Sequence, residues 1–151
     1  MNALTEEQQA IVATVRDFAE SELAPHAVAW DQEKHFPVDV LRQAGELGLG
    51  GIYARDDVGG AGLSRSDAVL IFEELAKGDT TIAAYISIHN MVVWMIDAFG
   101  TDEQRHRWVP KLATMEHLGS YCLTEPGAGS DAAAITTSAK TRPPRCLPRD
   151  P

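Results

Sequence analysis

The residues best suited to chemistry form one run, Tyr121 to Asp131, where apolar residues lead into a glycine-rich turn that ends in a hydroxyl and a carboxylate. Pro126 fixes the entry to the turn, while Gly127 and Gly129 can take backbone angles closed to other residues and let a ligand approach the main chain. Ser130 lies where a new helical turn could begin, and backbone N–H groups beside a hydroxyl favour phosphate. The pattern favours a flat, phosphate-bearing cofactor over an ordinary loop between strand and helix.

Other polar residues are scattered along the chain. His89 and Asn90 could face a substrate, although their place in the apolar stretch Thr80–Phe99 favours a polar pair whose hydrogen bonds are satisfied inside a helical core. The other four histidines lack a metal-ligand spacing, so we predict no metal site. The acidic pairs Asp56–Asp57 and Glu73–Glu74 are interpreted as solvated faces or helix caps.

The overall charge argues against nucleic acid as a partner. The 151 residues carry a formal net charge of −9, whereas binding to a phosphate backbone depends on clustered Lys and Arg. Residues 1–139 hold 21 acidic and 9 basic residues, but residues 140–151 hold 4 basic residues and 1 acidic residue. The last dozen residues therefore differ in character from the rest.

Cysteine use and the N-terminal sequence predict a cytoplasmic protein. Cys122 and Cys146 form neither a metal-ligand spacing nor a disulfide framework, which fits a reducing compartment. The N-terminus has the pattern of neither a secretion signal nor a transit peptide, although the mitochondrial matrix is the alternative for a eukaryotic source. Thr80–Phe99 is broken by polar residues and is interpreted as a buried helix, so no membrane association is expected.

Capping motifs and apolar periodicity predict five helices up to about residue 116. Helix starts are indicated by three pairs: Thr5 with Gln8, Ser64 with Asp67, and Thr101 with Gln104. The first helix should end near Pro25, Phe36–Pro37 should open the second, Thr80–Phe99 is the fourth, and Pro110 should bend or interrupt the fifth. The apolar stripes of the second and third helices are Val40, Leu41, Ala44 and Leu47, then Val69, Leu70, Phe72, Leu75 and Ala76.

The character of the sequence changes after residue 116. Leu118–Leu123 and Ile135–Ser138 are short, apolar or β-branched, and are predicted as strands. We therefore expect a mainly α chain with an N-terminal helical, bundle-like domain at 1–116 and the start of a β domain at 117–140. Residues 141–151 hold four prolines without periodicity and are predicted to form a disordered, Pro/Arg-rich tail.

The segment Tyr121–Asp131 resembles the first signature of the acyl-CoA dehydrogenases: an aromatic, then Leu-Thr-Glu-Pro, two variable positions and Gly-Ser-Asp. Supporting matches follow in the family's order at Gly59–Ser64, Phe72–Ala76 and Gly100–Arg105, and the resemblance covers about residues 4–140. Three further segments are most similar to the isobutyryl-CoA dehydrogenase branch, with other short-chain or branched-chain dehydrogenases as the competitor: Trp30–Gln32, Phe36–Val40 and Ala84–Met91.

The resemblance implies an FAD enzyme that dehydrogenates the Cα–Cβ bond of a short branched acyl-CoA, of the isobutyryl-CoA to methacrylyl-CoA type in valine degradation. Tyr121, Leu123 and Thr124 would lie along the flavin ring and tune it through hydrogen bonds. Gly129 and Ser130 would approach the pyrophosphate, and Ser130 would also meet the substrate's pantetheine arm. The remaining cofactor-binding positions are expected to act through backbone shape: Cys122, Glu125, Pro126, Gly127 and Ala128.

The same resemblance sets limits on this chain. The family's catalytic glutamate comes from a C-terminal helical domain, so no catalytic residue is assigned here, and Glu125 is interpreted as structural because Pro126 holds it at a strand end. Asp131 is expected to cap the following turn. The family implies an electron-transferring flavoprotein as acceptor and a homotetramer. We expect a truncated, inactive copy whose tail resembles out-of-frame translation; the alternatives are a non-enzymatic helical interaction module and part of a longer protein.

Overall fold

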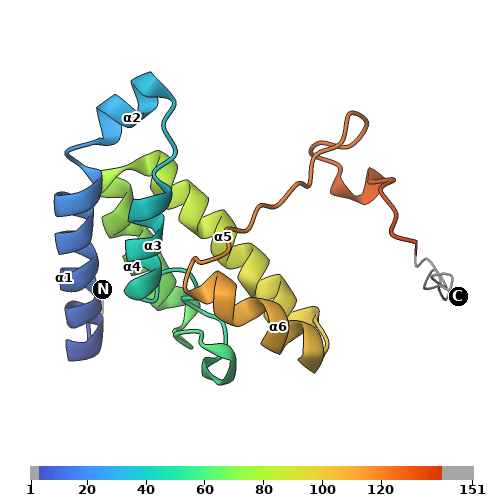
Figure 1. Cartoon of the computed structure of the whole chain (residues 1–151), viewed down its shortest axis with the longest axis horizontal. Helices are drawn as coiled ribbons and strands as arrows, with labels where there is room; N and C mark the ends of the chain where they lie inside the picture. The colour runs from blue at the N-terminus through green and yellow to red at the C-terminus, as the bar shows by residue number, and fades with distance from the viewer. Residues whose placement is uncertain (1–3, 141–151) are drawn as a thin grey trace, which may run out of the picture. The chain divides into compact units, whose positions relative to one another are not determined.

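A computed structural model describes residues 4–140, which are mainly helical (Figure 1). Six α-helices follow one another before residue 116: α1 (Glu6–Phe18), α2 (Ala27–Glu33), α3 (Val38–Glu46), α4 (Arg65–Gly78), α5 (Thr80–Phe99) and α6 (Asp102–Ala113). The chain divides into two compact units between Tyr121 and Cys122. The assignment of 1–116 and 117–140 to separate family domains stays a prediction.

All three predicted helix caps are present. The hydroxyls of Thr5, Ser64 and Thr101 accept the backbone N–H of the residue three positions on, at 3.1, 3.2 and 3.3 Å. In each case the third residue's side chain accepts the N–H of the cap in return. These reciprocal bonds satisfy N–H groups that have no partner within the helix, which explains why α1, α4 and α6 begin where they do.

Several helix predictions need correction. The first predicted helix continues after α1 as a π-helical turn, Ala19–Leu23. Helix α2 was not predicted, because it buries no residue and so has no apolar stripe. Helix α6 continues through Pro110 to Ala113. The predicted stripe of α4 is confirmed in part: Leu75 is buried and Phe72 and Ala76 pack against the core. Val69 is instead 64% exposed, and the stripe omitted the buried Ala68 and Ile71. Leu47, predicted to belong to the apolar stripe of α3, lies just after the end of that helix at Glu46 and is 45% exposed.

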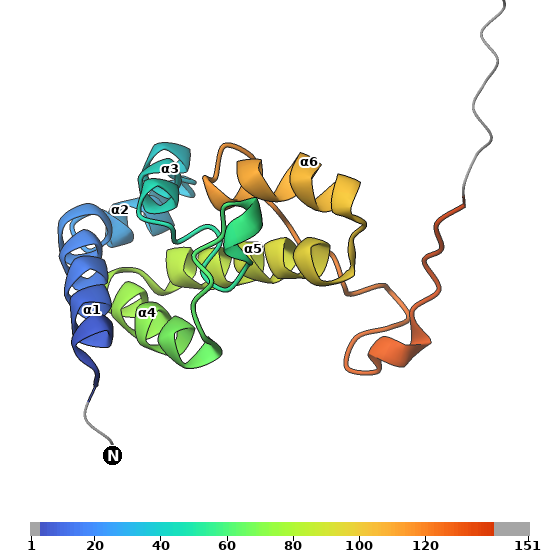
Figure 2. The ribbon, with the colours of Figure 1, turned by 90° about the horizontal axis from the view of Figure 1, so that it is seen from below.

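Helix α5 forms the centre of the first unit and runs between α4 and α6 (Figure 2). Within residues 4–140 it alone is long and apolar enough to cross a membrane by length and composition. It nevertheless buries His89, Asn90 and Asp97 as well as Ile86 and Val93. Its packing supports the interpretation of Thr80–Phe99 as a core helix.

No regular strand is present within residues 4–140, so both predicted strands, Leu118–Leu123 and Ile135–Ser138, are wrong. Residues 122–140 form one isolated bridge, between Glu125 and Ala128, and a 3₁₀ turn, Ala132–Ala134. A short strand needs neighbours to hydrogen-bond its backbone, and the described residues offer none. The predicted disordered tail, 141–151, lies outside the described residues.

Candidate functional site

The centre of the signature is a tight turn over four residues. The Glu125 N–H donates to the Ala128 carbonyl at 3.0 Å, and the Ala128 N–H donates to the Glu125 carbonyl at 3.1 Å. Pro126 and Gly127 form the tip, where proline favours the turn by fixing its own φ. Ala128 is buried while its neighbours are exposed. The Glu-Pro-Gly-Ala sequence therefore encodes a fixed backbone shape, as expected for these positions.

The Glu125 side chain links this turn by hydrogen bonds to Thr136 and Thr137, which follow the 3₁₀ turn. Its carboxylate accepts the Thr136 N–H and hydroxyl, both at 2.9 Å, and the Thr137 N–H at 2.8 Å. Hydrogen bonding from the Thr137 side chain, then from the Thr136 and Thr137 backbone, lowers the pKa of Glu125 to about 2. A carboxylate so acidic and so fully engaged is a weak base, which supports a structural role for Glu125.

The signature glycines differ from the expectation drawn from their sequence. Neither Gly127 nor Gly129 is in the left-handed region, which Gly48, Gly59 and Gly62 occupy. A Cβ placed on either signature glycine would meet no described atom within 4 Å. The packing of residues 4–140 therefore does not require glycine at 127 and 129, and the main chain there is open to an approaching group.

The other signature residues present their side chains to the surroundings. Tyr121, the last residue of the first unit, is 37% exposed, and Leu123 is 39% exposed. Cys122 is an exposed free thiol, and Thr124 and Ser130 are also exposed. Asp131 caps the 3₁₀ turn by accepting the Ala133 N–H at 3.2 Å, which confirms the predicted cap. The turn thus starts one residue later than expected for Ser130, and it is only three residues long.

His89 and Asn90 are core residues, so the alternative in which they face a substrate is wrong. The Asn90 amide oxygen accepts the Ile52 N–H at 2.7 Å, and its NH₂ donates to the carbonyls of Leu49 and Ile86 at 2.7 and 2.9 Å. His89 contacts backbone groups through both ring nitrogens, and its burial lowers its pKa. Both side chains are almost completely buried.

Two buried charge clusters were missed from the sequence. Glu74, predicted to be solvated, is 5% exposed and bonds to Arg16 and Lys77 at 3.1 and 2.7 Å. Hydrogen bonds from Arg16, then from Lys77, lower its pKa to about 2. A Glu three residues before a Lys in a helix is a visible signal, whereas the contact with Arg16 spans 58 positions and has no local signature.

The second cluster joins α5, α6 and the loop between α3 and α4. Arg105 bonds to Asp97 at 2.9 Å and to Asp57 at 2.8 Å, and Arg55 bonds to Asp97 at 3.1 Å. Asp57 is therefore an ion-pair partner and not simply a cap or a solvated residue. The cluster neutralises the charge of the buried Asp97, which fits a structural function.

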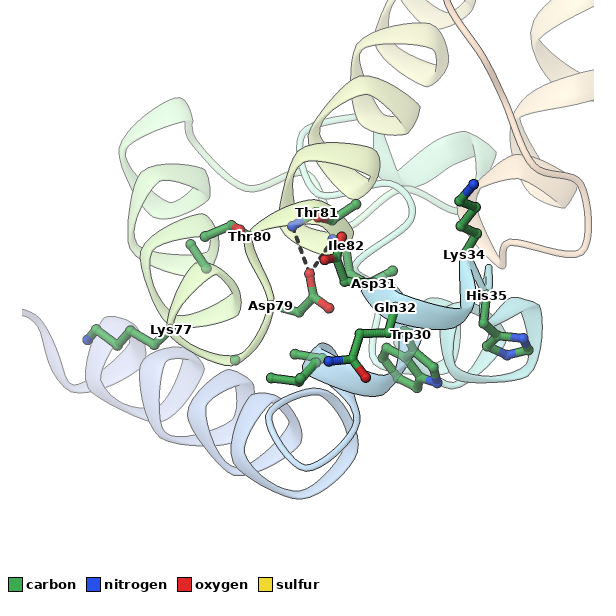
Figure 3. Close-up of a pocket in the computed structure, with 14 residues that line it drawn as sticks. Trp30, Asp31, Gln32, Lys34, His35, Lys77, Asp79, Thr80, Thr81 and Ile82 are labelled. Carbon is green, nitrogen blue, oxygen red and sulfur yellow. Dashed lines mark hydrogen bonds between the residues drawn. The ribbon is translucent and has the colours of Figure 1, made fainter.

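A separate cleft of about 740 Å³ lies beside α2 and the junction of α4 with α5 (Figure 3). Asp79, one of the two carboxylates that line it, already accepts the N–H groups of Thr81 and Ile82, at 2.7 and 3.0 Å. Trp30 stacks on His26 with ring centroids 5.2 Å apart. Within residues 4–140, every fully buried side-chain polar atom has a hydrogen-bond partner, and no cluster of acidic, His or Cys side chains could hold a metal ion. We assign this cleft no ligand.

Comparison with known proteins places these features in a family context. The family model described as "Acyl-CoA dehydrogenase, N-terminal domain" matches residues 5–116. The chain is 59% identical over 136 residues to the mitochondrial isobutyryl-CoA dehydrogenase of Bos taurus, and 54% identical over 136 residues to that of Dictyostelium discoideum. Each alignment covers 90% of this chain and 33% of the relative, so the chain spans about a third of their length.

Solved structures show the same fold. The acyl-CoA dehydrogenase from Bacillus anthracis, solved in complex with FAD, superposes with a TM-score of 0.80 at 35% identity. The match covers 88% of this chain and 23% of that one. The aligned part is thus nearly all of this chain but a minor part of the flavoprotein.

Proposed function

Because the chain belongs to the acyl-CoA dehydrogenase family, we propose that it is the N-terminal part of a flavin-dependent dehydrogenase acting on a short branched acyl-CoA, of the isobutyryl-CoA type. More than half of the aligned positions are identical to two isobutyryl-CoA dehydrogenases, which supports this branch of the family. By the same resemblance we propose an electron-transferring flavoprotein as electron acceptor and a homotetramer as the assembled form.

The observation that carries the proposal is the exposure of the signature residues. Tyr121 and Leu123 leave apolar surface exposed, Thr124 and Ser130 leave hydroxyls exposed, and nothing described lies beside a Cβ built on Gly129. These groups suit the two parts of FAD. The apolar side chains and the Thr124 hydroxyl suit the flavin ring, and the open backbone at Gly129 with the Ser130 hydroxyl suits the pyrophosphate. Buried sites for such ligands combine apolar surface with a few polar groups in this way.

The residues of this chain would position the cofactor and the substrate. Tyr121, Leu123 and Thr124 would contact the flavin ring, and Gly129 and Ser130 the pyrophosphate, with Ser130 also contacting the pantetheine arm. FAD, when bound, supplies the hydride acceptor. Glu125 stays ionised and engaged with Thr136 and Thr137, which argues against it as the base that removes the proton at the substrate's α carbon. By the family resemblance, that base would come from a C-terminal helical domain.

One consequence concerns the 151 residues on their own. The signature residues are largely exposed in this chain, so the isolated chain should neither retain stoichiometric FAD through purification nor dehydrogenate isobutyryl-CoA with an artificial acceptor. Absorbance of the purified protein near the flavin bands and a dye-reduction assay measure these two properties. Stoichiometric FAD, or a rate above that of free flavin, would contradict this expectation.

The cofactor role itself is tested by completing the chain. Residues 1–140 would be joined to the part of the Bos taurus relative that follows the aligned region, and the purified chimera would be assayed for FAD content. We expect about one FAD per chain. A matched variant, Gly129→Trp, fills the open space beside the main chain and should lose FAD while keeping its helical content. A chimera that folds but holds no FAD would refute the proposed role of the signature.

The competing candidate is a helical interaction module, favoured by apolar residues exposed on the first unit. Phe99 is 76% exposed and, with Met95 and Trp108, lines an apolar groove of about 400 Å³ beside α5 and α6. A monodisperse monomer of the isolated chain at high concentration, measured by light scattering, would favour this module. Soluble aggregates would favour an incomplete dehydrogenase whose apolar surface lacks its cover.

A further inference from the structure

The chain that leaves α6 is hydrogen-bonded to α5 at Gly119, before the signature begins. The Gly119 N–H donates to His89 Nδ1 at 3.0 Å, and its carbonyl accepts the Tyr85 hydroxyl at 3.3 Å. Tyr85 and His89 are one helical turn apart on α5 and hold both backbone polar groups of the same residue. Figures 1 and 2 show this segment passing along α5.

The His89 ring has one arrangement that satisfies both of its contacts. Nε2 lies 2.8 Å from the Leu112 carbonyl, which can only accept, so Nε2 carries the proton. Nδ1 is then unprotonated and accepts the Gly119 N–H. Burial lowers the pKa of His89, which maintains this neutral form. One ring therefore connects α5, the last turn of α6 and the exit segment.

Glycine allows the exit segment to approach α5 this closely. A Cβ at residue 119 would lie 3.1 Å from Val92 Cγ1 and 3.3 Å from Val92 Cβ. Both distances are shorter than ordinary carbon contacts, so a side chain at residue 119 would require Val92 or the backbone of residue 119 to shift by a few tenths of an ångström. Glycine at 119 therefore gives the closest fit of the exit segment against α5 at the place where it bonds to His89 and Tyr85.

We propose that His89 and Tyr85 are positioning residues for the cofactor signature, because they fix on α5 the point from which Tyr121 and the residues after it depart. Tyr121 follows Gly119 by two residues, a reach of at most about 7 Å, so a displacement of Gly119 passes directly to the first signature side chain. The interpretation of Tyr121–Ser130 as a cofactor segment rests on the proposed function. The attachment itself rests only on hydrogen bonds within the first unit.

Two substitutions separate the contacts of His89. In His89→Asn the amide oxygen replaces Nδ1 and keeps an acceptor for Gly119, whereas in His89→Gln the amide replaces Nε2 and keeps the donor to Leu112. Amide hydrogen exchange in the ¹⁵N-labelled 151-residue chain measures the result. We expect Gly119 to exchange about tenfold faster in His89→Gln and within about threefold of the parent in His89→Asn.

A second measurement distinguishes positioning from general stability. In a Cys146→Ser background, a nitroxide on the exposed thiol of Cys122 broadens the amide signals that it approaches. His89→Gln should spread this broadening over more residues of the helical unit while leaving helical content unchanged, and His89→Asn should restore the parent pattern. Equal Gly119 exchange in the two variants, or an unchanged broadening pattern in His89→Gln, would overturn the proposal.

Tyr85→Phe keeps the test decisive if both His89 variants fail to fold. It removes only the hydroxyl and keeps the ring that packs edge-on against Phe36 with centroids 4.9 Å apart. We expect the broadening from Cys122 to spread in this variant, and an unchanged pattern would overturn the proposal. None of these measurements involves flavin, so their failure is distinct from a failure of the chimera to bind FAD.

Discussion

At the scale of single residues, Glu125 shows how a signature carboxylate can be structural. A carboxylate next to a proposed flavin invites assignment as a base, but three backbone and side-chain donors at 2.8 to 2.9 Å hold it in the ionised form. The Pro-Gly turn after it could be anticipated from sequence. Its partners Thr136 and Thr137 could not, because they lie 11 and 12 positions away in a segment predicted as a strand.

The Glu125 contacts have a defined pH dependence. The pKa falls from 4.5 in the unstructured chain to about 2, so this fastening is complete above about pH 4.5 and is lost as the pH falls through about 2. The amide shifts of Thr136 and Thr137, followed by NMR, should titrate with a midpoint well below 4.5. Glu125→Gln should abolish that transition and speed their hydrogen exchange at neutral pH. A midpoint near 4.5 in the parent would contradict the described contacts.

At the scale of elements, buried polar residues determine how α5 packs. Asn90 joins it to the loop after α3, His89 joins it to α6 and Gly119, and Asp97 joins it to Arg55 and Arg105. The start and end of α5 agree with the predicted range Thr80–Phe99, since capping and apolar content are local properties. Arg105 is only 8 positions from Asp97, but the partners outside α5 and the first turn of α6 are 23 to 42 positions away, so local sequence could not identify them.

The Asp97 cluster should be essential to the fold. Asp97→Asn leaves Arg55 and Arg105 without their shared carboxylate, and breaking a buried ion pair is strongly destabilising. We expect the thermal midpoint to fall by at least about 10 °C. Asp102→Asn is the matched control, because Asp102 also bonds Arg105 but is 91% exposed, so its removal should change the midpoint by no more than about 2 °C. Similar shifts in the two variants would refute this ranking.

The contact of α3 with the end of α6 depends on glycine at one position. A Cβ on Gly45 would lie 2.2 Å from the Thr114 carbonyl oxygen, a backbone atom that cannot rotate away. Gly45→Ala should therefore lower the free energy of unfolding by about 1–3 kcal/mol, the usual range for overpacking. Gly127→Ala, with no atom within 4 Å, is the control and should be neutral. Urea unfolding of both variants decides the matter, and an equally stable Gly45→Ala would be the contrary result.

At the scale of the whole molecule, the described residues form a helical unit that ends at Tyr121 and a second unit that carries most of the cofactor signature. The family, the three capped helix starts and the core helix could be predicted because each depends on residues close in sequence. The strands could not be predicted correctly, because β-branched composition at Ile135–Ser138 indicates a preference, whereas a strand requires partners. The signature glycines similarly indicate space beside the backbone, not a particular φ.

The most direct test of the central claim uses the chimera of residues 1–140 with the remainder of the Bos taurus isobutyryl-CoA dehydrogenase, loaded with FAD under anaerobic conditions. Addition of isobutyryl-CoA should bleach the flavin absorbance, because the signature of this chain would hold the ring and the substrate arm in register for hydride transfer. The unmodified relative, treated in the same way, is the control. If the chimera folds and binds one FAD but its flavin stays oxidised while that of the relative is reduced, the assignment of this chain to the substrate-binding part of such a dehydrogenase is contradicted.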